Sequence, residues 1–225
     1  MPKYTIILAS GSGERAKYSS NNVPKQFVKI HNKQILSHTI SRFKEFNPET
    51  KIILSILPDY KYFIDKSDGN YKNLVFSTGG ITRAESVKNA LMQINDYNNF
   101  DLVAIHDGVR PFFTKETFVK LKNTAKEKGN AIPYTEINES VRIIKNDKSS
   151  EFIDRKNIVK LQTPQFFNIK KLKDAYSNFY NEDLTDDSRI FELAGEKIYL
   201  VKGDYENIKI TFKQDFEFIK TLLNN

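Results

Sequence analysis

Residues 4–15 read YTIILASGSGER, a short apolar run that passes into small and glycine residues. A β-branched run of this length, closed by glycine, is typical of a buried strand. The small residues allow backbone N–H groups to approach phosphate oxygens, and Arg15 can neutralise their charge. The alternative is a generic glycine turn with surface cations, since the loop matches neither G-x-G-x-x-G nor Walker A. The stretch thus predicts a first strand followed by a candidate phosphate loop.

Strand-like and helix-like segments alternate along the rest of the chain. Strands are predicted at residues 51–57, 73–77, 102–105, 131–134 and 198–201, and helices at 33–46, 84–94, 114–126, 170–180 and 186–194. Such alternation predicts right-handed βαβ crossovers and an α/β fold with a mainly parallel, doubly wound sheet. No internal repeat or low-complexity linker interrupts it, so we expect a single domain over residues 1–225.

Residues 137–161 break this alternation. Apolar and polar residues alternate there around the turn-like NDKSS at 146–150. This is a β-hairpin pattern. We expect an extended β-arm that projects from the sheet.

The composition excludes several classes of protein. Hydrophobic residues make up 39% and charged residues 28% of the 225, which is ordinary for a globular chain and unlike a disordered one. The absence of cysteine removes disulfides and Cys-based zinc sites. No apolar run approaches the ~20 residues that cross a bilayer, and the N-terminus lacks the pattern of a signal peptide. We therefore expect a cytoplasmic protein without membrane contact.

The formal net charge of +7 favours anionic partners. Lysines are scattered among acidic and amide residues, which indicates a solvated surface and not a nucleic-acid stripe. Such anionic partners could be nucleic acid, a membrane surface or phosphorylated small molecules, and the scattered lysines argue against nucleic acid.

Polar segments follow further predicted strands, at residues 79–86 (GGITRAES), 105–111 (IHDGVRP) and 204–211 (DYENIKIT). Ligands of an open parallel sheet bind beyond the carboxyl ends of its strands, near the point where strand order reverses. Gly80 permits close approach of a base, and Ser86 can hydrogen-bond a base edge. A plain strand-to-helix turn is the alternative there.

Asp107 and Arg110 offer a second set of candidate ligands. The carboxylate of Asp107 suits Mg²⁺ or a substrate hydroxyl, and Arg110 suits a phosphate. The alternative is an ion pair that stiffens the turn. Lys209 lies in a strand-like run, where a lysine facing solvent would be unremarkable.

The order of these motifs is more specific than any one of them. The motifs are the loop with Arg15, Pro24-Lys25-Gln26-Phe27, GG-x-x-R-x-x-S, HDGVRP, Asp154-Arg155, Thr163-Pro164-Gln165-Phe166, Leu184-Thr185-Asp186-Asp187 and Asn207-Ile208-Lys209-Ile210-Thr211. In this order, from about residue 4 to residue 220, they resemble the 2-C-methyl-D-erythritol 4-phosphate cytidylyltransferase family.

The resemblance implies a Rossmann-like nucleotidyltransferase domain, a homodimer built by the arm, CTP with Mg²⁺ or another divalent cation, and a small polyol phosphate as acceptor. Catalytic roles would fall to Arg15 and Lys25 at the α-phosphate, and to Arg155 and Lys209. The CTP-binding residues would be Ala9, Ser10, Gly11, Gly13, Gly80, Ser86 and Asp107, with Asp107 also beside the metal. The acceptor would be held by Asp107, Arg110, Ser140, Arg155, Thr185 and Lys209, with Ser140 and Arg155 acting in the partner subunit's site.

The sequence also departs from the family pattern. Arg15 is followed by Ala16 and a longer polar insert, residues 17–23, before Pro24-Lys25. Ile81 occupies a position that is often acidic, and Ser140 one where Thr is common. The ribitol 5-phosphate cytidylyltransferases of surface-polymer synthesis share most of the motifs and are the alternative acceptor class.

Overall fold

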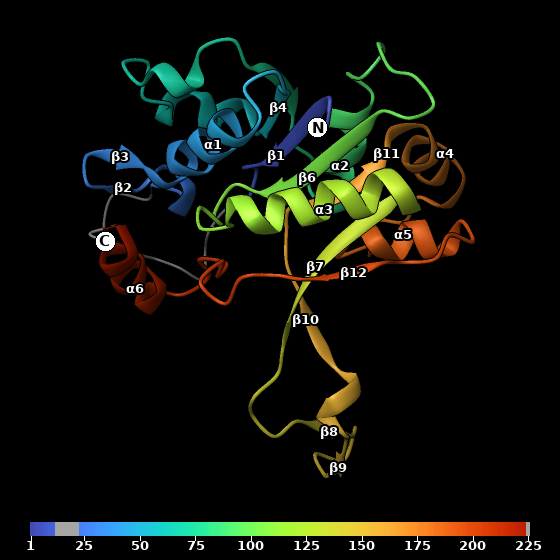
Figure 1. The fold of residues 1–225 in the computed structure, drawn as a ribbon. Coiled ribbons are helices and arrows are strands. Elements are labelled where there is room, and N and C mark those ends of the chain that lie inside the picture. The colour runs from blue at the N-terminus through green and yellow to red at the C-terminus, as the bar shows by residue number, and fades with distance from the viewer. Residues whose placement is uncertain (12–22, 224–225) are drawn as a thin grey trace.

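A computed structural model describes residues 1–11 and 23–223, and its centre is an eight-stranded sheet (Figure 1). The strand order is β10-β7-β11-β6-β1-β4-β5, and β12 pairs with β7. The strands are β1 (Tyr4–Leu8), β4 (Lys51–Ile56), β5 (Val75–Thr78), β6 (Leu102–Asp107), β7 (Asn130–Glu136), β10 (Val159–Leu161), β11 (Gln165–Asn168) and β12 (Leu200–Lys202). Two hairpins lie outside it, β2 (Lys29–Ile30) with β3 (Lys33–Gln34) and β8 (Arg142–Ile144) with β9 (Ser150–Phe152).

The strand directions confirm the predicted α/β class with a mainly parallel sheet. Strands β6, β1, β4 and β5 pair in parallel, and β12 runs parallel to β7. Strand β11 was not predicted, and it pairs antiparallel with both β6 and β7. Its apolar run is only Phe166 and Phe167, both fully buried, which is too short to show a period.

Six helices are described: α1 (Ile35–Phe46), α2 (Arg83–Leu91), α3 (Lys115–Lys128), α4 (Ile169–Phe179), α5 (Asp187–Leu193) and α6 (Lys213–Leu223). Short 3₁₀ turns lie at η1 (Lys25–Phe27), η2 (Pro58–Phe63), η3 (Gly69–Tyr71) and η4 (Arg155–Asn157). Side chains of Thr82, Thr114, Asn168 and Asp186 cap the N-termini of α2 to α5, which satisfies backbone N–H groups that the helices leave unpaired. None of the described helices is long and apolar enough to cross a membrane.

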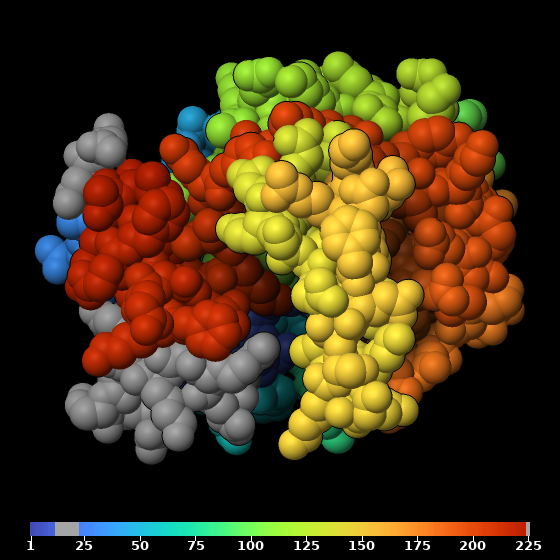
Figure 2. All heavy atoms as spheres, turned by 90° about the horizontal axis from the view of Figure 1, so that it is seen from below, coloured from blue at the N-terminus to red at the C-terminus, as the bar shows by residue number. Residues whose placement is uncertain are grey.

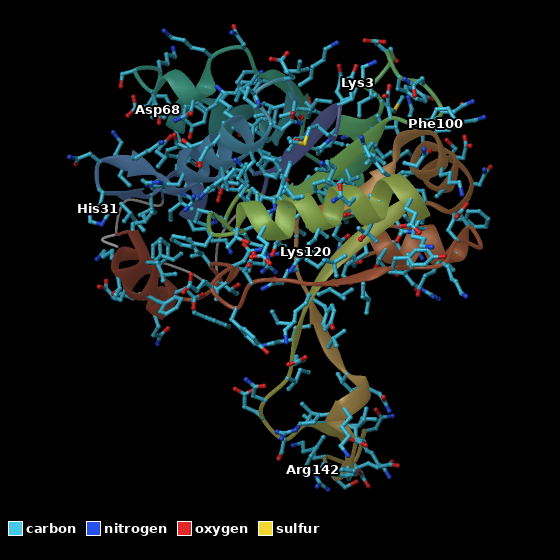
Figure 3. All side chains as sticks on the ribbon, in the orientation of Figure 1. Lys3, His31, Asp68, Phe100, Lys120 and Arg142 are labelled. Atoms are coloured by element: carbon cyan, nitrogen blue, oxygen red, sulfur yellow. The ribbon has the colours of Figure 1, made fainter. Side chains whose placement is uncertain are left out.

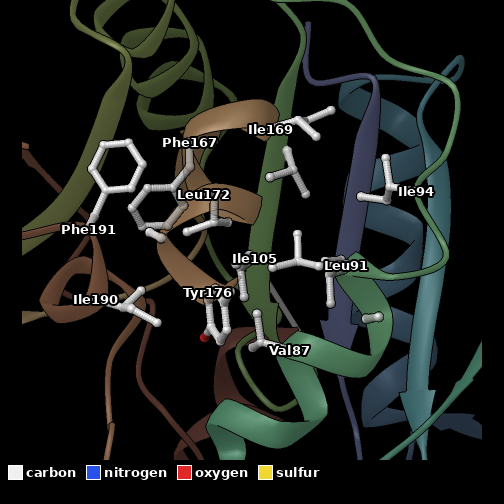
Figure 4. Close-up of a cluster of buried hydrophobic side chains, with 14 of the residues drawn as sticks. Val87, Leu91, Ile94, Ile105, Phe167, Ile169, Leu172, Tyr176, Ile190 and Phe191 are labelled. Carbon is white, nitrogen blue, oxygen red and sulfur yellow. The ribbon is translucent and has the colours of Figure 1, made fainter. Parts of the chain in front are cut away.

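The helices cover the two faces of the sheet. On one face, Val87, Leu91 and Ile94 from α2 and the turn after it gather with Ile105 of β6 and with side chains of α4 and α5 in one buried cluster (Figure 4). On the other face, α1 and α3 bury Phe43 and Phe118. Each Å² of apolar surface removed from water contributes about 25 cal/mol to folding. The apolar side chains buried in these two layers are therefore the main source of folding stability.

Helix α6 is a second element that the sequence interpretation missed. Phe216 and Ile219 are fully buried, and they pack in a separate apolar cluster with Val28 and Val109. The cluster attaches the C-terminal segment beside the end of β6.

The register of the sheet places four strand ends on one edge. Leu8 of β1 lies opposite Ser55 of β4 and Asp107 of β6, and Ile56 of β4 lies opposite Thr78 of β5. Strand β4, the next strand of this sheet along the chain, pairs with one side of β1, and the later strand β6 pairs with the other side. The strand order therefore reverses at β1. A ligand site is expected at this edge.

The arm is shorter than predicted. Its hairpin is β8 with β9, whereas β10, the end of the predicted range, pairs with β7 and belongs to the sheet. Alternation of apolar residues is the same in a free hairpin and in a sheet strand, so sequence could not separate them. Side chains of the arm, with Arg142 at its far end, project away from the rest of the chain (Figure 3).

Candidate functional site

A cavity of about 770 Å³ opens where the parallel strands end. Its walls come from residues 8–11, 25–26, 57, 79–83, 85–86, 107, 109 and 209. Figure 2 shows a hollow between the arm (yellow) and the C-terminal segment (red), with blue N-terminal atoms at its floor. Of the predicted site residues, Ala9, Ser10, Gly11, Lys25, Gly80, Ser86, Asp107 and Lys209 line this cavity. Gly13 and Arg15 lie outside the described residues.

Gln26, which received no role from the sequence, positions the loop after β1. Its Nε2 donates to the carbonyls of Ala9 at 2.7 Å and Gly11 at 3.1 Å. The neighbouring turn can approach because Gly79 has no side chain, since a Cβ there would lie 2.4 Å from Cβ of Ser10. The candidate phosphate loop is therefore held from both sides.

Ser86 shapes the turn at residues 79–86. Its Oγ lies 3.0 Å from Gly80 N, 3.0 Å from Thr82 O and 2.9 Å from Ser10 Oγ. Gly80 N donates to this hydroxyl, and either hydroxyl can be the donor between Ser10 and Ser86. The side chain is also buried. Ser86 thus joins the loop after β1 to the start of α2 on the cavity wall, and its contact with a base stays a prediction.

Asp107, at the end of β6, is surrounded by cations. Its Oδ2 lies 3.0 Å from Nε of Arg110 and 3.1 Å from Nζ of Lys209, and Oδ1 lies 3.9 Å from Nε of Arg83. Burial by itself raises the pKa of Asp107, but the charges of Lys209, Arg110 and Arg83 outweigh burial and hold that pKa well below its usual range. The carboxylate is therefore ionised and orients these cations.

Arg83 and Asp187 form a buried ion pair that sequence reasoning missed. Nη2 of Arg83 lies 2.6 Å from Oδ2 of Asp187, and Tyr176 OH donates to Oδ1 of Asp187 at 2.7 Å. Burial raises the pKa of Tyr176 well above its usual value, so it remains a donor. Arg83 links α5 to Asp107 and to the cavity. In the sequence, the only indication of a role for Arg83 is its position in GG-x-x-R-x-x-S, and that motif does not indicate which residue pairs with it.

The segment at residues 207–211 brings Lys209 to Asp107. It is irregular, and the strand-like expectation for it is wrong, because carbonyls of its backbone accept hydrogen bonds from side chains and Ile210 N donates to the carbonyl of Val109, which lies in a turn. Arg110 Nη1 donates to Asn207 O at 2.9 Å, and Lys25 Nζ donates to Ile210 O at 2.7 Å. Asn207 Nδ2 donates to Thr163 O at 2.8 Å. Three separate parts of the chain thus converge on this segment.

The other predicted acceptor residues lie apart from the cavity walls. Ser140 and Arg155 are exposed on the arm, and Arg155 donates to the carbonyl of Asn138. Thr185 is exposed just before Asp186, the N-cap of α5. Arg110 is not among the residues that line the cavity, and its Nε forms an ion pair with Oδ2 of Asp107.

Asp107 also fits the predicted role at a divalent cation. The described residues contain no group of three or more metal-ligating side chains. Mg²⁺ bound to a nucleotide keeps several waters and needs only one or two carboxylates besides the phosphates. Oδ1 of Asp107, which lies 3.9 Å from Nε of Arg83, can supply one.

Comparison with known proteins gives a consistent result. The family model for 2-C-methyl-D-erythritol 4-phosphate cytidylyltransferase matches residues 4–225. The Clostridioides difficile protein of that name is 34% identical over 224 residues, with 97% of this chain and 92% of that protein covered. A bifunctional IspD/IspF enzyme of Pelagibacter ubique is 41% identical over 215 residues, and 95% of this chain matches 55% of that enzyme's length. The solved cytidylyltransferase of Francisella tularensis has a TM-score of 0.82 at 31% identity, covering 98% of this chain and 99% of that one.

Proposed function

The chain belongs to the 2-C-methyl-D-erythritol 4-phosphate cytidylyltransferase family, and on that premise we propose that it transfers CMP from CTP to 2-C-methyl-D-erythritol 4-phosphate. The products are the CDP-linked methylerythritol and pyrophosphate, in isoprenoid precursor synthesis by the non-mevalonate pathway. The observation that carries the proposal is the convergence of the loop after β1, the turn at residues 79–86, Asp107, Lys25 and Lys209 on one cavity. Relatives named for methylerythritol phosphate support this acceptor over ribitol 5-phosphate.

The described residues divide the binding tasks between two sides of the cavity. Ala9, Ser10 and Gly11 border the triphosphate, as backbone N–H groups after a strand suit phosphate oxygens. Gly80 borders the base. Lys209, held by Asp107, binds the phosphate of the acceptor, and Arg110 fixes Asp107 from outside the cavity walls.

The chemistry is a displacement at phosphorus. An oxygen of the acceptor phosphate attacks the α-phosphorus of CTP, the new P–O bond forms, and the bond to the β-phosphate bridging oxygen breaks. Because a phosphate dianion carries no proton to remove, no general base is needed. Nucleophile and electrophile are both anionic, so the residues act by screening repulsion and aligning attack, with Lys25 and Arg15 at the α-phosphate.

A divalent cation would be held by Asp107 and the triphosphate. Bound there, it would neutralise phosphate charge that develops during the displacement.

We also propose that the arm builds a homodimer. Ile143, Ile144 and Phe152 on the hairpin are 50%, 79% and 71% exposed. A two-stranded hairpin is marginal by itself, and packing against a second arm would bury these side chains in a two-fold contact. Arg155 and Ser140 would then enter the partner's acceptor site, since neither lines the cavity of its own chain.

A direct assay tests the reaction. The purified protein is given CTP and Mg²⁺ with methylerythritol 4-phosphate or ribitol 5-phosphate in turn, and released pyrophosphate is measured. We expect the higher kcat/KM with methylerythritol 4-phosphate. Equal or better use of ribitol 5-phosphate would overturn the assignment of the acceptor.

A further inference from the structure

We propose that Asp215 is a positioning residue for Lys209, because it fixes the turn that joins the segment at residues 207–211 to helix α6. The inference rests on the proposed function, in which Lys209 binds the phosphate of the acceptor. It gives the C-terminal helix a part in that reaction, although residues 213–223 are not among the described residues that line the cavity.

Lys209 depends on its backbone for its position. The segment at residues 207–211 belongs to no helix or strand, so no ladder of backbone hydrogen bonds holds it. The ammonium of Lys209 lies 3.1 Å from Oδ2 of Asp107 at the end of a side chain that is 39% exposed. A lysine carries its charge on a flexible four-carbon stem. The place of this charge therefore depends on contacts that fix the segment itself.

Asp215 supplies such contacts at the C-terminal end of the segment. Its Oδ2 accepts hydrogen bonds from Thr211 N at 2.6 Å and from Phe212 N at 2.8 Å, and its own N–H donates to the carbonyl of Phe212 at 3.2 Å. A side chain of the first helical turn that reaches back to the backbone before the helix forms one half of a capping box. Hydrogen bonds from backbone N–H groups to a carboxylate are charge-assisted and short. One side chain thus closes the turn between the segment and α6.

Apolar packing anchors this turn to the rest of the protein. Ile210 is fully buried and packs in one cluster with Phe216 and Ile219 of α6. Its N–H donates to the carbonyl of Val109 at 3.2 Å. Helix α6 is therefore a fixed support, and Asp215 connects the segment to it.

These contacts place Lys209 between two fixed points. Asn207, two residues before it, accepts a hydrogen bond from Nη1 of Arg110 at 2.9 Å. Thr211, two residues after it, is held by Asp215. Fixing the backbone of a residue has an entropic cost, and with both points in place this cost is met during folding. Without the second point, binding of the acceptor must meet the cost, which lowers affinity.

The test compares two substitutions of Asp215. In Asp215→Ala both accepted hydrogen bonds are lost, and the KM for methylerythritol 4-phosphate should rise about 10-fold, since ordering one residue has a free-energy cost of that size. Asp215→Asn keeps a carbonyl oxygen as acceptor and should recover most of the wild-type KM. The KM for CTP should stay within about twofold of wild type in both variants, because the proposed nucleotide contacts lie on the loop after β1 and the turn at residues 79–86.

The matched control is Asn168→Ala. Asn168 caps α4, where its Oδ1 accepts from Lys171 N at 3.1 Å, and it is not among the residues that line the cavity. Loss of a helix cap lowers stability in either variant. The control should therefore lower the urea midpoint but keep the KM for the acceptor. An equal rise of that KM in Asn168→Ala would assign the effect to lost stability and overturn the role of Asp215.

A double substitution tests whether Asp215 acts through Lys209. Lys209→Ala removes the ammonium, so adding Asp215→Ala should change the KM for the acceptor by less than about twofold. Two independent losses that multiply in the double variant would contradict the proposal. An unchanged KM in Asp215→Ala alone would do the same, while leaving the proposed reaction intact.

Hydrogen exchange measures the positioning without substrate. The N–H of Ile210 is protected by its bond to Val109, so it should exchange at least ~10-fold faster in Asp215→Ala and at the wild-type rate in Asn168→Ala. If the wild-type protein transferred CMP to neither acceptor, the proposed reaction would fail, and this exchange rate would still decide whether Asp215 fixes the segment. Equal exchange in wild type and Asp215→Ala would overturn the inference.

Discussion

His106 should make the free energy of unfolding depend steeply on pH. The side chain is fully buried between Phe43 and Phe113, with ring centroids 5.1 and 4.9 Å away. Its Nε2 donates to the carbonyl of Arg110 at 2.8 Å, whereas Nδ1 is buried and has no hydrogen-bond partner among residues 1–11 and 23–223. Burial lowers the pKa of His106 to about 3, since protonation would leave an unpaired N–H and a charge among aromatic rings.

The sign follows from proton binding in the two states. The folded protein keeps a neutral imidazole down to about pH 3, but the unfolded chain binds a proton below about pH 6.5. Stability from His106 is therefore complete above about pH 6.5 and is lost as the pH falls. The loss is about 1.4 kcal/mol per pH unit, or roughly 2.7 kcal/mol between about pH 7.5 and about pH 4.5.

Urea unfolding of wild type and His106→Gln across this range measures the effect. The variant lacks the titrating group, so its pH dependence should be shallower than that of wild type by roughly 2.7 kcal/mol. Leu121→Ala, a buried change on α3 without a titrating group, should lower stability similarly at every pH. If wild type and His106→Gln had parallel pH profiles, the argument that burial keeps His106 neutral would be refuted.

Three further predictions concern the cavity and the arm. Lys25→Ala should reduce turnover by two to three orders of magnitude, which corresponds to ~3–4 kcal/mol of transition-state stabilisation. The variant should lose only about 1 kcal/mol of folding stability, because it removes the hydrogen bond to the carbonyl of Ile210. Near-normal turnover would exclude Lys25 from the α-phosphate. Arg83→Met should cost roughly 3–5 kcal/mol in urea unfolding because it leaves Asp187 buried without its partner. Adding Asp187→Asn should recover part of that loss, and additive losses would contradict the pairing. Mixed Lys25→Ala and Arg155→Ala chains should regain part of the wild-type activity, since one site of a heterodimer would carry neither lesion; no recovery despite proven subunit exchange would place Arg155 in cis.

The sequence alone predicted the class of fold and much of the cavity. The apolar run at residues 4–8 and the glycines after it are neighbours along the chain, as are the residues of HDGVRP. Strand and loop patterns of this kind depend on residues that are adjacent in the chain, so they can be recognised from the sequence without a structure. Ala9, Gly80 and Asp107 were found because the carboxyl ends of parallel strands meet at one edge.

Only the tertiary structure decided how those residues are used. The place of β11 between β6 and β7 depends on pairing with residues that are 35 or more positions away in the chain, which a two-residue apolar run does not encode. Arg83 and Asp187 are 104 residues apart, and their ion pair becomes strong only where folding excludes water. Ser86 is the base-reading candidate by sequence, but its contacts with Ser10 and Gly80 exist only because the loop after β1 packs against the turn at residues 79–86.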